Sequence, residues 1–314
     1  MKNSAVPLED FHSHGTSVAL GFFDGVHPGH RAILESAGHY AAGLAPCCFT
    51  FSNHPSLLLH PGGSLRLITD FSERCHLIAE SGLTCVYADF SEAFSHLSPE
   101  DFARVVLVEK LKARHVSCGP NYNFGYKASG TAEKLKSIGK RLGFDVHISD
   151  YCRDHGRIIS STLIRNFIAE GDFESVSRIL GRPYRICGEV RHGLARGRTI
   201  GLPTANILIP AEKMTPPYGV YAVWANIGDG FVPSLAYYGS RPTFSGLEPW
   251  LEVNVGACSE AGCELGFSLY GKKLEVLFCM QVRGEMRFSS ADELTAQIAR
   301  DKQMACRFFA AASL

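Results

Sequence analysis

The chain has 314 residues, which favours two domains of ordinary size, and its 46% hydrophobic and 20% charged residues are typical of a globular protein. Lysine and arginine together number 31, as do aspartate and glutamate, and no basic block occurs. This balance argues against a nucleic-acid partner, so any phosphate that the protein handles is expected in a local site.

The cysteines and the N-terminus predict a cytoplasmic protein. The eleven cysteines are odd in number and show no C-x-x-C spacing, which favours reduced thiols. The first fifteen residues lack the apolar core of a secretory signal. Residues 36–65 carry no acidic residue, lysine or arginine, but prolines and histidines interrupt them, so no membrane-spanning helix is expected.

Strands and helices are expected to alternate through the first half of the chain. Short apolar or β-branched runs predict strands at 17–23, 45–52, 83–90, 115–119 and 144–149. Helical spacing, capping residues and stop glycines predict helices at 30–43, 70–82, 98–113 and 130–143. Such alternation predicts a parallel α/β sheet that is covered on both faces.

The pattern changes near Gly181–Tyr184, where Gly-Arg-Pro ends a helix. Beyond it, β-rich runs bounded by Gly and Pro occur at 184–190, 204–209, 219–227, 232–239, 250–257 and 272–282. They predict an antiparallel barrel or sandwich, closed by a helix from Ala291 to about Phe308. We therefore expect two domains, residues 1–182 and residues 183–314.

The segment GFFDGVHPGH, residues 21–30, has two histidines three residues apart at a strand-to-helix junction. Structural histidines, a metal pair and a phosphate site are the three alternatives. Zinc takes three or four well-spaced ligands, and no second histidine or cysteine pair has that spacing. Helix N-termini at the carboxyl ends of parallel strands bind phosphate, and the flanking glycines let backbone approach a ligand. The junction therefore favours a phosphate site.

The same segment resembles the H-x-G-H nucleotidyltransferase signature of prokaryotic bifunctional riboflavin kinase/FAD synthetases. Three further segments resemble the family in the same order along the chain: FTFSNHP (49–55), GPNYNFGYKASG (119–130) and ISSTLIR (159–165). The resemblance implies a Rossmann-like parallel α/β nucleotidyltransferase domain, followed by an antiparallel β-barrel riboflavin kinase domain with a closing helix.

The resemblance also implies roles for residues of the first domain. His27 and His30 would stabilise the α-phosphate of ATP while the phosphate of FMN attacks it and pyrophosphate leaves. Asn123 and Phe124 would hold nucleotide or flavin. ATP or phosphate contacts are implied for Gly21, Phe23, Asp24, Gly25, Gly29, Ser160, Ser161, Thr162 and Arg165. Helix capping by the hydroxyls and a turn-shaping role for Asn123 are the alternatives.

Two positions of the first domain depart from the family pattern. Phe22 stands where many relatives carry a small polar residue, and it is expected to alter packing beside the nucleotide. Ala128 stands where many carry arginine, so one charged contact is expected to be absent.

The stretch GEVRHGLARGRTIGLPTANI, residues 188–207, resembles the riboflavin kinase pattern. Glycine-rich backbone can wrap phosphates, and a hydroxyl and an amide oxygen are suited to Mg²⁺. The resemblance implies phosphate contacts for Gly188, Gly193, Gly197 and Arg198, and Mg²⁺ ligation by Thr204 and Asn206. The alternative for Pro-Thr-Ala-Asn is a purely structural role, in which these residues only shape a turn.

The segment LEVNV, residues 251–255, resembles the family segment that carries its general base. Glu252 would accept the proton of the terminal ribityl hydroxyl of riboflavin. Arg283 and Phe288 would be flavin-side contacts. Asn254 replaces a histidine of many relatives, and residues 256–271 are longer than usual, so weak kinase activity is an alternative.

The resemblance implies a bifunctional enzyme that phosphorylates riboflavin to FMN and adenylylates FMN to FAD. Its co-substrate would be ATP with Mg²⁺, and its partners small molecules, with neither nucleic acid nor membrane; a homo-oligomer is compatible with this hypothesis. One alternative is an FAD synthetase whose C-terminal domain only holds flavin. Another is a non-catalytic flavin or nucleotide sensor.

Overall fold

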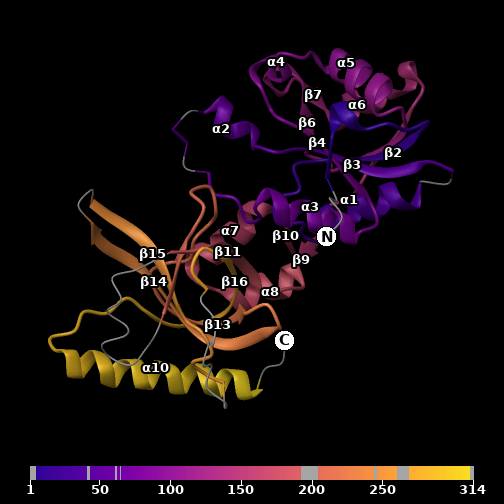
Figure 1. Cartoon of the computed structure of the whole chain (residues 1–314). Helices are drawn as coiled ribbons and strands as arrows, with labels where there is room; N and C mark the ends of the chain where they lie inside the picture. The colour runs from indigo at the N-terminus through magenta and orange to yellow at the C-terminus, as the bar shows by residue number, and fades with distance from the viewer. Residues whose placement is uncertain are drawn as a thin grey trace. The chain divides into compact units, whose positions relative to one another are not determined.

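The computed structural model describes residues 5–40, 43–60, 62–63, 65–191, 204–243, 246–259 and 269–311, with the side chains of 241–248 also left undescribed. The chain divides into two compact units, Met1–Ser161 and Thr162–Leu314, and each contains its own sheet (Figure 1). None of the helices in the described part of the chain is long and apolar enough to cross a membrane.

The first unit is built on a six-stranded sheet of order β1-β4-β3-β2-β5-β8, in which every neighbouring pair is parallel. Its strands are β1 (Ala5–Pro7), β2 (Thr16–Leu20), β3 (Ala45–Phe51), β4 (Thr84–Ala88), β5 (Ala113–Cys118) and β8 (Asp145–Ile148). Its helices are η1 (Leu8–Asp10), α1 (Pro28–His39), α2 (Pro55–Leu59), α3 (Phe71–Glu80), α4 (Glu92–Ser95), α5 (Pro99–Asp101), the π-helical η2 (Phe102–Lys110), η3 (Tyr126–Ala128) and α6 (Ala132–Leu142). Two small hairpins complete it: β6 (Asn123–Phe124) with β7 (Gly130–Thr131), and β9 (Arg153–Asp154) with β10 (Arg157–Ile158).

Apolar side chains cover both faces of this sheet, which is why its strands are apolar runs rather than alternating ones. Along β2, Val18 and Leu20 belong to the core shared with η2 and α6, whereas Ala19 belongs to the core shared with α1 and α3. Helices therefore pack on both faces, and the predicted parallel α/β fold is confirmed.

The strand order places a topological switch point beside β2. The chain proceeds from β2 through β3 to β4 on one side, and then crosses to β5 and β8 on the other side. Ligands of open α/β sheets bind beyond the carboxyl ends of the strands at such a point. The segments that follow β2 and β5, residues 21–27 and 119–130, are therefore the segments placed to form a site.

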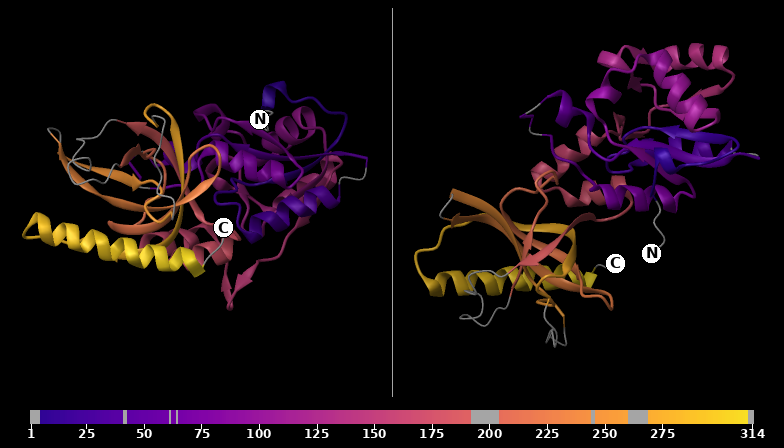
Figure 2. Two further views of the ribbon diagram at one scale, coloured as in Figure 1. Left: turned by 60° about the horizontal axis from the view of Figure 1, so that its bottom comes forward. Right: turned by 45° about the horizontal axis from the view of Figure 1, so that its top comes forward.

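The second unit is a closed antiparallel barrel of order β11-β12-β15-β14-β13-β16. Its strands are β11 (Tyr184–Arg191), β12 (Ala205–Leu208), β13 (Gly219–Asn226), β14 (Phe231–Thr243), β15 (Gly246–Asn254) and β16 (Lys273–Gly284). The helix α10 (Ala291–Ala311) lies along the barrel (Figure 2), where Phe309 meets Trp224 with ring centroids 4.8 Å apart. The predicted barrel and closing helix are confirmed.

Two helices precede the barrel, α7 (Ser161–Glu170) and α8 (Phe173–Leu180). Phe173 of α8 packs its ring against Tyr184 and Phe278, with centroids 6.0 Å and 5.3 Å away. This packing explains why α8 belongs to the same compact unit as the barrel, and the division lies earlier in the chain than the expected boundary between residues 182 and 183. As a boundary between activities, the expected one stays a prediction.

The ten cysteines in the described part of the chain are all free thiols. Five of them are buried in the first unit: Cys47, Cys48, Cys75, Cys85 and Cys118. Burial raises the pKa of Cys47 and that of Cys118 to about 12. These side chains therefore behave as small apolar core residues rather than as nucleophiles.

Candidate active sites

The first candidate site begins where β2 ends, at the switch point of the parallel sheet. The strand stops at Leu20 rather than at Phe23 as predicted. The reason is that Phe23, Gly25 and Val26 adopt positive φ angles of 61°, 81° and 40°. Such angles are costly for Phe and Val and end a strand, so the surrounding structure must hold this turn in place.

Asp24 supplies much of that support. Its buried carboxylate accepts hydrogen bonds from the backbone nitrogens of Ile68 and Thr69, at 2.9 Å and 3.0 Å, and from Thr69 Oγ1 at 3.1 Å. Thr69 Oγ1 in turn accepts from the nitrogen of Gly25 at 3.0 Å. Asp24 thus anchors the turn to residues 68–69, and its contact with ATP stays a prediction.

His27 and His30 are brought together at the start of α1. His27 caps the helix, because its Nδ1 accepts from the backbone nitrogen of His30 at 3.3 Å. The two rings stack with centroids 3.6 Å apart and an interplanar angle of 19°. A Cβ on Gly29 would lie 3.2 Å from Cε1 of His27, so a glycine leaves room for this ring. The pair is therefore placed to act on one group.

The electrostatics of His30 favour its neutral form. Burial lowers its pKa well below the ordinary value, and the nearby charges of His27 and Arg74 lower it further. Its Nδ1 is buried without a hydrogen-bond partner. Among the described residues, no group of three or more histidine, cysteine, aspartate or glutamate side chains could hold a metal ion. A neutral imidazole still carries one N–H, so the pair can donate hydrogen bonds to a bound group.

A cavity of about 360 Å³ opens beside the histidine pair. Nine Phe and Tyr rings line it: Phe22, Phe23, Phe49, Phe51, Phe90, Phe94, Phe102, Tyr122 and Phe124. Its polar groups include His30, Asn121 and Asn123. An apolar, aromatic cavity with a few polar groups at one place suits a flat ring system that carries a polar substituent.

The segment 119–130 forms one side of this cavity and is held by packing. Gly125 has a φ of 72°, and a Cβ there would lie 2.8 Å from Pro99, so the segment approaches α5 closely. A Cβ on Gly130 would lie 2.7 Å from the ring of Phe124. The predicted contact residues Asn123 and Phe124 both line the cavity.

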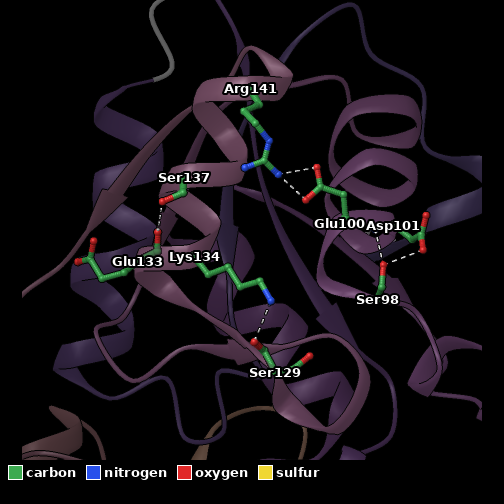
Figure 3. Close-up of polar contacts among 8 residues, drawn as sticks. All are labelled: Ser98, Glu100, Asp101, Ser129, Glu133, Lys134, Ser137 and Arg141. Atoms are coloured by element: carbon green, nitrogen blue, oxygen red, sulfur yellow. Dashed lines mark hydrogen bonds and ion pairs between the residues drawn. The ribbon is translucent and has the colours of Figure 1, made fainter.

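Polar contacts around this segment fix the neighbouring helices (Figure 3). Lys134 Nζ donates to the carbonyl oxygen of Ser129 at 3.3 Å, which ties α6 to the end of the segment. Arg141 Nη2 donates to both carboxylate oxygens of Glu100, at 2.7 Å and 2.6 Å, which ties α6 to α5. The cavity wall therefore rests on two helices that are bonded to each other.

The predicted serine segment reaches the same turn. Ser161 Oγ donates to the carbonyl oxygen of Asp24 at 2.9 Å. Thr162 and Arg165 follow in the first turns of α7, within the second compact unit. The structure thus joins Ser161 to the turn that carries the histidine pair, while phosphate binding by Ser160, Ser161, Thr162 and Arg165 stays a prediction.

The second candidate site lies on two neighbouring barrel strands. Asn206 of β12 and Glu252 of β15 are directly paired across the antiparallel ladder, so their side chains leave the same face of the sheet. Asn206 is 5% exposed, and its Oδ1 is buried without a hydrogen-bond partner. An unsatisfied amide oxygen is a suitable cation ligand, and Thr204 stands just before β12. The donor set therefore fits Mg²⁺.

The glycine-rich segment is only partly described. Gly193, Gly197 and Arg198 lie outside the described residues. Gly188 lies inside β11, where a Cβ would overlap the carbonyl oxygen of Leu208 on β12. Close approach of two strands therefore explains Gly188, and its phosphate contact stays a prediction.

The two expected flavin-side residues of the barrel lie together. Arg283 Nε donates to both carboxylate oxygens of Asp301 on α10 at 3.0 Å, and its Cζ is 5.6 Å from the ring centroid of Phe288. Asp301 is 1% exposed and also accepts a hydrogen bond from Gln297 Nε2 at 2.8 Å, so its charge serves groups within the protein. The sequence did not indicate Asp301, although it lies in the predicted closing helix.

Sequence reasoning also missed Arg74 of α3. The side chain is fully buried, its Nη2 donates to the carbonyl oxygen of Phe51 at 2.6 Å, and its Cζ lies 4.0 Å from the ring centroid of Phe22. One signal was available: Arg74 shares helical spacing with Phe71 and Ile78, which puts it on the apolar face of its helix.

Both halves of the chain match known families. Residues 10–163 match FAD synthetase, and residues 180–309 match riboflavin kinase. The bifunctional riboflavin kinase/FMN adenylyltransferase of Escherichia coli (strain K12) is 33% identical over 299 residues, covering 94% of this chain and 93% of that protein. The chain belongs to this bifunctional family.

Other relatives of the family agree. The Bacillus subtilis (strain 168) protein of the same name is 33% identical over 300 residues, covering 93% of this chain and 92% of that protein. A crystal structure described as a macrolide-efflux protein from Streptococcus pneumoniae superposes with a TM-score of 0.84 at 30% identity, covering 96% of this chain and 98% of that chain. The predicted family is confirmed, and both of its domains are present in the predicted order.

Proposed function

We propose that the chain carries out two consecutive steps of flavin cofactor synthesis. The C-terminal unit phosphorylates riboflavin to FMN, and the N-terminal unit transfers the adenylyl group of ATP to FMN, which gives FAD and pyrophosphate. The observation that carries the proposal is the stacked pair of His27 and His30 beside an aromatic cavity at the switch point.

In the N-terminal site the flavin ring occupies the aromatic cavity, where it stacks on the wall residues. A phosphate oxygen of FMN attacks the α-phosphorus of ATP, and the bond to the outgoing pyrophosphate breaks. His27 and His30 donate hydrogen bonds to the oxygens that gain negative charge. Ser160, Ser161, Thr162 and Arg165 hold the outer phosphates of ATP.

In the C-terminal site Glu252 accepts the proton of the terminal ribityl hydroxyl, whose oxygen attacks the γ-phosphorus of ATP. Thr204 and Asn206 are the residues that would hold Mg²⁺, which neutralises phosphate charge when bound. Arg283 and Phe288 contact the flavin on its other side. This part of the proposal rests on the ladder pairing of Asn206 with Glu252 and on the unsatisfied Asn206 oxygen.

The test is chromatography of the products made from riboflavin, ATP and Mg²⁺ by full-length protein. In His30→Ala we expect FAD formation to fall about 100-fold or more, so that synthesis stops at FMN. In Glu252→Ala we expect FMN formation to fall about 100-fold or more, while added FMN is still converted to FAD. Each variant is therefore the control for the other.

The outcomes separate the alternatives. Wild-type protein that converts FMN to FAD, but makes no FMN from riboflavin, would be an adenylyltransferase whose barrel only holds flavin. Tight flavin binding without any product would instead indicate a sensor. Undiminished FAD output from His30→Ala would contradict the assignment of the first site. The proposal otherwise keeps the expectation of a cytoplasmic enzyme whose partners are small molecules.

A further inference from the structure

Phe22 occupies an unusual place in the first site. It follows β2 and lines the aromatic cavity together with His30. Its carbonyl oxygen accepts a hydrogen bond from Thr50 Oγ1 at 3.1 Å. Its ring meets the ring of His54 edge-on, with centroids 4.4 Å apart. Backbone and ring are therefore both held by neighbouring segments.

A buried cation lies against the face of this ring. The guanidinium carbon of Arg74 is 4.0 Å from the Phe22 ring centroid, and Arg74 Nη2 is fixed by the carbonyl oxygen of Phe51. Arg74 Nε and Nη1 are buried without hydrogen-bond partners. The guanidinium is thus anchored at one nitrogen, while its Cζ lies over the aromatic ring.

A purely structural side chain at this position would not need a charge. Burying a cation is costly, and an apolar side chain of similar volume often gives equal or greater stability. Burial lowers the pKa of Arg74, in line with this cost, and the charge of Asp24 opposes the shift. A cation stacked on an aromatic ring is worth more when both are away from water. The charge of Asp24 is the largest favourable influence on this cation, and the faces of Phe22 and, at 5.5 Å, Phe71 are further contacts that a charge strengthens.

We propose that Phe22 is a specificity-determining residue for the flavin, and that Arg74 is the positioning residue that holds its ring as a fixed wall of the cavity. The inference rests on the proposed function, because it assigns the aromatic cavity to the flavin of FMN. A fixed wall beside His30 sets where the flavin ring stops, and hence where its phosphate meets the histidine pair. Arg74 itself is not among the residues that line the cavity.

The test is steady-state adenylylation of FMN by full-length Phe22→Leu, Arg74→Met and the double variant. We expect each single variant to raise the KM for FMN about tenfold, with kcat and the KM for ATP changed less than about twofold. Because Arg74 acts through Phe22, the double variant is expected to be no worse than either single one. Arg74→Lys keeps a cation and is expected to recover part of the loss.

Matched controls separate this role from a general effect on folding. Arg66→Met removes an exposed arginine from the segment before α3 and is expected to leave the KM for FMN unchanged. Phosphorylation of riboflavin by the same proteins reports on the barrel and should not change. If Arg74→Met does not fold, Phe22→Tyr replaces it: an aromatic face should keep the KM within about twofold, unlike Phe22→Leu.

Three results would overturn the inference: an unchanged KM for FMN in Arg74→Met or in Phe22→Leu, additive effects in the double variant, or a loss confined to kcat or to the KM for ATP. Each leaves the proposed function intact, provided that the wild-type protein makes FAD from FMN. Wild-type protein that makes no FAD overturns the proposed function instead, and the two failures are therefore distinguishable.

Discussion

The two candidate sites obtain their geometry in different ways. In the first unit the histidine pair lies on a turn between β2 and α1, where Phe23, Gly25 and Val26 have positive φ angles. In the second unit Asn206 and Glu252 lie on strands and face each other through ladder register alone. One site depends on a strained turn and its anchors, whereas the other depends on the closure of a barrel.

The two sites should therefore be sensitive to different kinds of substitution. The turn depends on the hydrogen bonds that Asp24 accepts, so loss of a polar anchor should affect the first site. The strand β12, which carries Asn206, also pairs with β11 and approaches it closely at Gly188, so added volume there should displace β12 and affect the second site. Substitutions in one unit, assayed by both activities, test whether the two sites fail independently.

The largest effect is expected from Gly188→Ala. A Cβ at this position would overlap the carbonyl oxygen of Leu208, so β11 and β12 would have to separate. We expect a loss of about 3 kcal/mol in the stability of the barrel unit. After heating of the full-length protein, riboflavin phosphorylation should be lost at a lower temperature than in the wild type, while FMN adenylylation should be lost at the wild-type temperature.

Gly284→Ala is the control, because Gly284 of β16 has open space around its Cβ position. It should leave both inactivation temperatures within the error of the assay. If Gly188→Ala lowered both inactivation temperatures equally, the two units would unfold together, and the two sites would not be independent.

A smaller effect, on the other unit, is expected from Asp24→Asn. In the wild type a carboxylate accepts hydrogen bonds from the backbone nitrogens of Ile68 and Thr69 and from Thr69 Oγ1. The substitution replaces this charged acceptor by a neutral amide. Hydrogen bonds to a charged group are stronger than neutral ones, so we expect a loss of about 2 kcal/mol. Adenylylation should then be the activity lost at the lower temperature. Asp150→Asn, at an exposed carboxylate, is the control; equal effects of the two substitutions would show that Asp24 is not an anchor.

The smallest effect concerns pH. Burial lowers the pKa of His30 in the folded protein, whereas in the unfolded chain it is about 6.5. Below that value the unfolded chain takes up a proton that the folded protein does not, so stability falls as the pH falls. The loss in the free energy of unfolding that His30 causes approaches at most about 1.4 kcal/mol per pH unit. Urea unfolding from about pH 7 to about pH 5 should show a steeper loss in the wild type than in His30→Gln; parallel curves would contradict the buried neutral state.

The sequence indicated the features that have a local signal. Strand-to-helix junctions, capping residues and the order of motifs predicted the parallel sheet, the barrel and the positions of His27 and His30. The histidines could be predicted together because they are three positions apart at a helix start, where cap and first turn are close in any fold.

Features that depend on distant segments could not be predicted in the same way. β2 ends early because Phe23 and Val26 have positive φ, and neither residue type announces this conformation. The contact of Arg74 with Phe22 joins α3 to the turn after β2, and only tertiary packing brings them together. The pairing of Asn206 with Glu252 likewise follows from barrel register. The helix expected over 98–113 is π-helical from Phe102 to Lys110, which apolar spacing does not reveal.

The buried thiols of the first unit have a practical consequence. Because Cys47 and Cys118 are enclosed by the sheet and its helices and remain protonated, an alkylating reagent can reach them only when the unit opens. The rate at which they become labelled therefore measures the opening of the adenylylating unit directly. Substrates that bind the closed form should slow that labelling, so the protein contains its own reporter of ligand binding and needs no introduced probe.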